Sequence, residues 1–244
     1  MFSNEVNLVS ISIKLYFYKL KAYSNLFNWL ILVQIVALLF SLGGVSSTGG
    51  SNNEVSVSVT HYSSNLVIVF SFFWIWFIAI QLTTKQYKNL ETTMVTNRIT
   101  ENLSSIGYLL TACAFGGITS SLGGLLLRVI MYFTSNRSQL IFDGFYLAYS
   151  DLFLGMVVGI LYMVLISAIS YLLGVIARIN MVIGAIIIAL IIGLLRIYTN
   201  LAQMAFEFIT YEVSLPLFAL KVVTISIVLF GVSMLLSNRR EVSQ

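Results

Sequence analysis

The chain has very little charge. Only 9% of its 244 residues are Asp, Glu, Lys or Arg, 59% are hydrophobic, and the mean hydropathy is +0.96. A typical soluble domain has about 25% charged residues. A water-facing surface cannot be built from so few charges, so the sequence predicts an integral membrane protein that uses lipid as its outer solvent.

Proline, cysteine and histidine each occur once, as Pro216, Cys113 and His61. One cysteine excludes a disulfide within the chain, and one cysteine with one histidine cannot supply a His/Cys metal cluster. Because proline is so rare and the Leu, Ile, Val and Phe runs are long, helices are favoured over a transmembrane barrel. We therefore expect an all-α fold.

The motifs of intramembrane proteases and nucleotide-binding proteins are also missing. The sequence has no GxSG segment with a later membrane histidine, no HExxH and no GxxxxGK[ST]. We expect no catalytic residue, no metal ligand and no cofactor in this chain, which is not an enzyme by itself. The net charge of +4 does not indicate nucleic acid, because Lys and Arg gather on the cytoplasmic loops of membrane proteins.

Six apolar runs are candidate membrane-spanning helices. They cover residues 25–42, 66–82, 107–133, 150–177, 181–195 and 216–236. Lys and Arg concentrate on one side of the topology that these runs define, and by the positive-inside rule that side is the cytoplasm. The sequence thus predicts a multi-pass protein with both termini in the cytoplasm.

Residues 5–24 contain too many lysines to span a bilayer. On a helical wheel Val9 and Ile13 share one side and Lys14 and Lys21 lie opposite. This pattern is typical of a helix in the membrane interface with its lysines toward anionic headgroups. The alternative is that the segment is only the polar flank of the first span.

Two segments are expected on the outer side. Residues 43–64 form a Ser/Gly/Asn-rich stretch without Lys or Arg, which indicates an extracytoplasmic loop. Residues 197–215 are too polar to span and too apolar for a free loop. We interpret them as an external helix or a re-entrant hairpin before the sixth span.

Six charged residues lie near the expected outer ends of the spans. Charge at membrane depth is normally paired or faces a polar cavity. These residues either form salt bridges that tie the external hairpin to the spans, or they line an exit path or contact a charged substrate. They are Arg128, Asp151, Arg196, Glu207, Glu212 and Lys221.

Small residues recur every four positions in the third and fourth expected spans, and such spacing lets helices approach closely. Packing within the chain and dimerisation through these faces are both compatible with the pattern. The positions are Gly116, Ser120, Gly124, Gly155 and Gly159.

The longest polar segment with a helical pattern joins the second and third spans on the cytoplasmic side. It reads QLTTKQYKNLETTMVTNRITENLSSIG over residues 81–107. Tyr87, Leu90 and Met94 recur at helical spacing, which predicts an amphipathic helix within residues 84–105 at the membrane surface.

This arrangement of an interfacial helix, six spans, a helical cytoplasmic segment and an external hairpin resembles the permease subunit of a bacterial ABC-2-type exporter. The most specific local part is residues 91–106, ETTMVTNRITENLSSI. Many members carry a T-x-P-x-[SN]-R segment there. Residues 93–98, TMVTNR, are similar, with Val95 where proline is frequent.

The resemblance implies a membrane-spanning subunit in the bacterial cytoplasmic membrane that works as a homodimer with two copies of a separate ATPase. That partner would bind the ATP and magnesium. The cargo would be hydrophobic or amphipathic, a lipid, a drug or a peptide such as an antimicrobial peptide. The segment between the second and third spans would be the coupling helix, with Lys88, Glu91, Asn97, Arg98 and Glu101 as candidate ATPase contacts.

A second hypothesis belongs to a different class of protein. A non-transporting immunity or sensor protein that binds a peptide within its membrane spans would have the same composition and no motor of its own.

Overall fold

The computed structural model of this chain describes most of its residues. The described residues are 8–44, 46–52, 55–84, 97–134, 149–179, 181–197, 203, 207 and 214–238.

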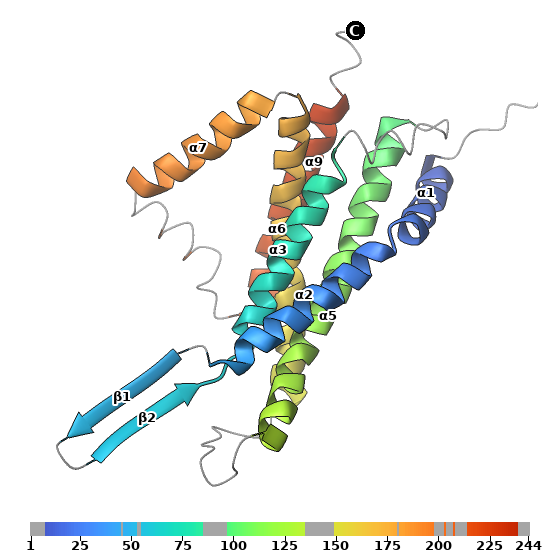
Figure 1. The fold of residues 1–244 in the computed structure, drawn as a ribbon. Coiled ribbons are helices and arrows are strands. Elements are labelled where there is room, and N and C mark those ends of the chain that lie inside the picture. Colours follow the sequence, from blue (N-terminus) through green and yellow to red (C-terminus); the bar gives the residue numbers. More distant parts are fainter. Residues whose placement is uncertain are drawn as a thin grey trace, which may run out of the picture. The chain divides into compact units, whose positions relative to one another are not determined.

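The described part is helical apart from one hairpin of two strands (Figure 1). The elements are α1 (Leu8–Ala22), α2 (Asn25–Leu42), β1 (Ser46–Asn52), β2 (Val55–His61), α3 (Asn65–Gln81), α5 (Arg98–Thr134), α6 (Tyr149–Ile179), α7 (Met181–Ile197) and α9 (Leu215–Asn238).

Within the described residues, four helices are long and apolar enough to cross a membrane, namely α2, α5, α6 and α9. The helices α3 and α7 cover the second and fifth expected spans, but each has only 17 residues. Six spans were expected, so the structure supports four of them by length and composition. Helix α2 covers residues 25–42, as expected for the first span.

The hairpin corrects the expectation of a loop over residues 43–64. Strands β1 and β2 pair antiparallel without interruption, from Ser46 opposite His61 to Asn52 opposite Val55. The sequence of β2, VSVSVTH, alternates β-branched and small polar residues with the period of a strand. The Ser and Gly content of the segment outweighed this alternation in the sequence-based prediction.

Helix α5 differs from its expected boundaries as well. A coupling helix ending at residue 105 and a span beginning at residue 107 were expected, yet Arg98 to Thr134 form one helix of 37 residues. At 1.5 Å per residue its length is about 55 Å, well beyond the ~30 Å of a bilayer's hydrocarbon core. Backbone hydrogen bonds do not depend on side-chain polarity, so the change from polar to apolar residues does not end the helix. The first part of the expected coupling helix, residues 85–96, lies outside the described residues, as do residues 1–7 of the N-terminus.

The chain divides into two compact units. Unit 1 contains Met1–Ser24, Ile75–Cys113 and Leu161–Gln244, and unit 2 contains Asn25–Trp74 and Ala114–Ile160.

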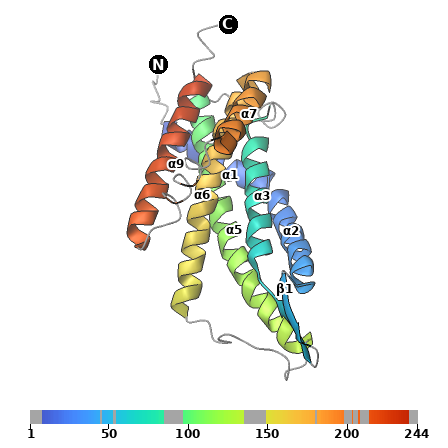
Figure 2. The same ribbon diagram turned by 90° about the vertical axis from the view of Figure 1, so that its left-hand side faces the viewer.

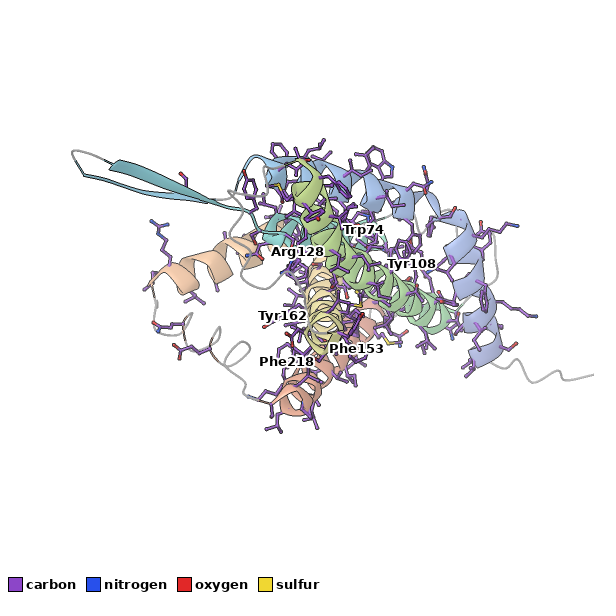
Figure 3. All side chains as sticks on the ribbon, turned by 90° about the horizontal axis from the view of Figure 1, so that it is seen from below. Trp74, Tyr108, Arg128, Phe153, Tyr162 and Phe218 are labelled. Carbon is purple, nitrogen blue, oxygen red and sulfur yellow. The ribbon has the colours of Figure 1, made fainter. Side chains whose placement is uncertain are left out.

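In unit 2, the C-terminal part of α5 packs against α2, α3 and the start of α6. Ala37 and Leu38 of α2, Val67 of α3 and Leu127 of α5 form a buried apolar cluster. At its other end, the indole N–H of Trp74, labelled in Figure 3, donates a hydrogen bond to the Leu26 carbonyl at 3.1 Å.

In unit 1, α9 runs along the C-terminal part of α6 (Figure 2). Two aromatic pairs join these helices. The ring centroids of Tyr162 and Phe218 are 5.1 Å apart (Figure 3), and those of Tyr171 and Phe230 are 6.0 Å apart. Such tilted pairs stabilise helix contacts beyond simple burial.

The exposed faces of two membrane helices are apolar, although the buried core is mostly apolar as well. Helix α2 buries Gln34 and Ser41, whereas its Trp29, Ile35 and Leu39 are more than half exposed. Helix α9 likewise buries two serines among its inward-facing residues. Lipid as the outer solvent accounts for this arrangement, because hydrocarbon accepts apolar side chains and excludes polar ones.

Candidate functional site

Of the segment that carries the family resemblance, residues 98–106 fall at the beginning of α5, and residues 91–96 lie outside the described residues. We call residues 98–108 the α5 head. Asn97 precedes the helix and caps it. Its carbonyl accepts a hydrogen bond from the Glu101 N–H at 3.1 Å and another from the Thr100 hydroxyl at 2.5 Å. Its side-chain oxygen lies 3.5 Å from the Ile99 nitrogen, the position expected of an N-cap acceptor.

A buried lysine of α1 binds the α5 head. Lys19 is 0% exposed, and its Nζ donates to the Ser105 Oγ at 2.6 Å and to the Glu101 carbonyl at 3.2 Å. The Ser105 hydroxyl itself donates to the Glu101 carbonyl at 2.9 Å. Lys14 and Lys21 are the lysines that the sequence pattern directs toward headgroups, and both are exposed, whereas Lys19 lies within the protein. It shares its side of α1 with Ser12 and Leu15, and this is the side that meets protein.

A second contact joins the α5 head to α9. One guanidinium nitrogen of Arg98 donates to the carbonyl of Ser237 at 3.1 Å, next to the last residue of α9. The final carbonyls of a helix lack partners within the helix and form its negative end, so a cation there is doubly favourable. Arg98 was expected to be a contact for another protein, and the structure places it half-buried against this helix end.

A third contact joins the α5 head to α6. The hydroxyl of Tyr171 donates to the Asn102 Oδ1 at 3.0 Å, and both side chains are almost completely buried. Sequence reasoning missed Asn102. Its spacing indicates its role: Asn102 is four residues after Arg98 and three before Ser105, so the three share one face of a helix.

The end of the α5 head contacts the chain just after α1. The Tyr108 hydroxyl donates to the Tyr23 carbonyl at 3.2 Å, and the two rings meet edge to face at 6.0 Å. Gly107 allows close approach of Tyr16, since a Cβ at Gly107 would lie 3.2 Å from the Tyr16 ring. The α5 head is thus bonded to α1, α6 and α9, all within unit 1.

The arrangement contains hydrogen-bonding groups and no recognisable chemistry of bond making. Among the described residues, no group of three metal-ligating side chains is found. The α5 head is helical and is hydrogen-bonded directly to α1, α6 and α9.

The predicted ATPase contacts are placed only in part. Asn97, Arg98 and Glu101 lie at the start of α5, with Asn97 exposed and the other two half-buried. Lys88 and Glu91 lie outside the described residues.

The six charged residues expected near the outer ends of the spans are distributed over both units. Arg128 and Asp151 belong to unit 2, and Arg196, Glu207 and Lys221 belong to unit 1. Asp151 accepts a hydrogen bond from the Ser150 hydroxyl at 3.4 Å, and Glu207 accepts one from Gln203 at 2.8 Å. Glu212 lies outside the described residues, as does most of the expected external hairpin at 197–215.

The small residues of α5 pack within the chain. Gly116 and Ser120 are buried, and a Cβ at Gly124 would lie 2.9 Å from the Ser64 Oγ. On α6, by contrast, a Cβ at Gly155 or Gly159 would meet no other atom of the described residues within 4 Å. The GxxxG pair of α6 is therefore uncovered by the part of the chain that the structure describes.

Unit 2 contains one polar junction between helices that sequence reasoning did not single out. The Gln34 amide of α2 donates to the Ser71 Oγ of α3 at 2.9 Å and to the Thr119 Oγ1 of α5 at 3.0 Å. Such bonds hold membrane helices together, since lipid offers these groups no alternative partner.

In the part of the chain that the structure describes, four helices are long and apolar enough to cross a membrane, and hydrogen bonds join α1, α6 and α9 to the start of α5. Comparison with protein-family models, with curated protein sequences and with solved structures gives no match.

Proposed function

We propose that this chain is the membrane-spanning permease subunit of an ATP-driven exporter, and that the α5 head carries displacement from a separate ATPase into the membrane helices. The observation that carries the proposal is the continuity of α5. The described polar residues of the segment with the family resemblance, from Arg98 onward, and the apolar span belong to one 37-residue helix.

A continuous helix supports this role because its backbone hydrogen bonding runs without a break from Arg98 to Thr134. A motor outside the membrane can act on the spans only through an element that is stiff along its length. A hinge at Gly107 would prevent α5 from transmitting a displacement along its length. Helical hydrogen bonding passes through this residue, and the ring of Tyr16 packs against it.

The three contacts of the α5 head support it further. Lys19, Arg98 and Asn102 take part in hydrogen bonds that reach α1, α9 and α6. A movement of the α5 head would act on all three neighbours. Bonds to charged groups contribute more than neutral ones, about 1.5–3 kcal/mol each, so the Lys19 and Arg98 contacts are the stronger ones.

The remaining parts of the proposal follow from the resemblance and the composition. Six spans would cross a bacterial cytoplasmic membrane, with α3 and α7 at the short end of the spanning range, which begins at about 17 residues. Both termini would be cytoplasmic. Two copies of the ATPase would bind ATP and magnesium and act on two identical permease chains, and the cargo would be a lipid, drug or peptide with a large apolar surface.

The experiment uses the ATPase encoded by an adjacent reading frame with GxxxxGK[ST]. The two proteins are produced together, and the ATPase that copurifies with this chain is measured. Scrambling residues 85–96 should abolish copurification. If an intact ATPase copurifies equally well with the scrambled chain, the coupling role is wrong.

A matched variant separates assembly from transmission. Asn102→Leu removes a buried partner of Tyr171, and a side chain that is 1% exposed cannot form part of an ATPase-binding surface. We expect this variant to keep its ATPase and to lose most cargo-stimulated ATP hydrolysis in proteoliposomes. Normal stimulation would show that the Asn102 contact does not transmit the movement. Absence of any ATPase partner would favour the immunity or sensor hypothesis.

A further inference from the structure

Helix α1 has three distinct faces. The first meets protein and consists of Ser12, Leu15 and Lys19, all buried. The second is apolar and exposed, with Val9, Ile13 and Phe17 at 59, 50 and 62% exposure. These residues follow one another at every fourth position, so they form one stripe.

The third face is basic. Lys14 and Lys21 are exposed and seven residues apart, which is two helical turns, so they lie one above the other. At about 100° per residue they lie roughly 90° from the apolar stripe, beside it rather than opposite as the sequence pattern indicated, and away from the buried face. The helix LVSISIKLYFYKLKA contains no acidic residue. An exposed apolar stripe beside a row of lysines is complementary to the surface of an anionic bilayer, in which acyl chains lie beneath negative headgroups.

The buried side of α1 contacts the α5 head. The same helix that presents Lys14 and Lys21 outward sends Lys19 inward to Ser105 and the Glu101 carbonyl. A change in the position of α1 would therefore change the position of the first turns of α5.

We propose that α1 docks on anionic lipid through Lys14, Lys21 and its apolar stripe, and that Lys19 transmits this docking to the α5 head. Anionic lipid then sets the position of the α5 head. The consequence for an exporter rests on the proposed function, but docking and its transmission do not. Lys19 is a positioning residue in this scheme, because it acts through α5.

The test uses the full chain with Cys113→Ala as background, reconstituted in nanodiscs. One nitroxide label replaces Tyr18 on α1, and a second replaces Leu103 on the α5 head, both exposed positions. The discs contain phosphatidylcholine alone or phosphatidylcholine mixed with phosphatidylglycerol. Label mobility and the distance between the two labels are measured by electron paramagnetic resonance.

Phosphatidylglycerol should immobilise both labels in the unaltered chain. A lysine near an anionic surface changes the ratio of docked to undocked helix by about fivefold. The Lys14→Gln, Lys21→Gln double variant should therefore lose about twenty-five-fold in that ratio, and Lys14→Arg, Lys21→Arg should restore it. High salt should reproduce the effect of the glutamines, since it screens surface charge.

Lys19→Met separates docking from transmission. The label at position 18 should still respond to phosphatidylglycerol, while the label at position 103 should no longer follow it. Ser105→Ala tests the same link without altering α1 and should weaken the response at position 103 in the same direction.

Two results would overturn the proposal. If the label at position 18 is equally mobile in both lipids, or if the glutamine variant responds like the unaltered chain, α1 does not dock on anionic lipid. If position 103 follows the lipid in Lys19→Met and in Ser105→Ala, Lys19 does not position the α5 head. Should the glutamine variants lose ATPase copurification while no lipid response exists, the basic face binds protein. None of the label measurements contains an ATPase, so a failure here is distinct from a failure of the proposed function.

Discussion

The Nζ atom of Lys19 lies 2.6 Å from the Oγ atom of Ser105, so a completely buried lysine of α1 is hydrogen-bonded to the second turn of α5. The two residues are 86 positions apart in the sequence. A buried ammonium group is costly unless its donors are satisfied, and here a hydroxyl and a backbone carbonyl satisfy two of them. This contact fixes where α1 meets α5.

Removing the hydroxyl alone should be more harmful than removing both partners. Ser105→Ala deprives the buried ammonium of an acceptor and should lower the free energy of unfolding by about 1.5–3 kcal/mol. Lys19→Met with Ser105→Ala should be less destabilised than Ser105→Ala alone, because the buried ammonium is removed together with its acceptor. Thermal unfolding of the purified chain in detergent measures both. Equal losses for the single and double variants would argue against the bond.

For the neutral pair of Tyr171 and Asn102, the loss of one partner should likewise lower stability more than the loss of both. Tyr171→Phe leaves the Asn102 amide in a buried site without the hydroxyl proton it accepts, at a cost of about 1–3 kcal/mol. The control is Tyr171→Phe combined with Asn102→Leu, which removes both polar groups and should recover part of the loss. Unfolding midpoints in a fixed detergent give the comparison, and a purely additive double variant would contradict it.

Gln34 should contribute to the stability of unit 2. Gln34→Leu removes the bonds to Ser71 and Thr119 while keeping much of the side-chain volume. Single interhelical bonds in membranes contribute about 0.6 kcal/mol on average, so a loss of about 1 kcal/mol is expected. Ile35→Leu is the matched control, since Ile35 is the exposed neighbour and should change little. Resistance to unfolding by sodium dodecyl sulfate reports the difference.

Gly117 and Gly155 should respond differently to the same substitution. A Cβ at Gly117 would lie 3.0 Å from the backbone nitrogen of Ile160, so Gly117→Ala should cost about 1–3 kcal/mol through overpacking. A Cβ at Gly155 meets nothing within 4 Å among the described residues, so Gly155→Ala should leave the folded monomer intact. Expression level and elution by size exclusion in detergent check both. Equal behaviour of the two variants would contradict the packing described for α5.

The sequence allowed the positions of the apolar helices to be predicted closely, because each is a long run of Leu, Ile, Val and Phe. It did not allow the faces of α1 to be assigned. A helical wheel separates apolar from basic positions, but which side meets protein depends on α5, and the sequence of α1 contains no information about that partner. The burial of Lys19 could therefore not be predicted.

Sequence reasoning singled out two residues of the candidate site but not their contacts. Arg98 and Glu101 were singled out because charge is rare in this chain, and both lie at the start of α5. Their contacts could not be predicted, since Ser237 and Lys19 are far away in the sequence. Asn102 was missed because a neutral amide among polar neighbours is inconspicuous until Tyr171 is known to face it.

The hairpin of β1 and β2 has a practical consequence for anyone who concentrates this protein. Its strands pair one to one without a bulge, and their sequences, SSTGGSN and VSVSVTH, contain no proline, lysine or acidic residue. Natural sheets use such residues on their edge strands to prevent association with other chains. Purified samples at high concentration should therefore tend to self-associate through this hairpin, and a lysine introduced into either strand should keep them monodisperse.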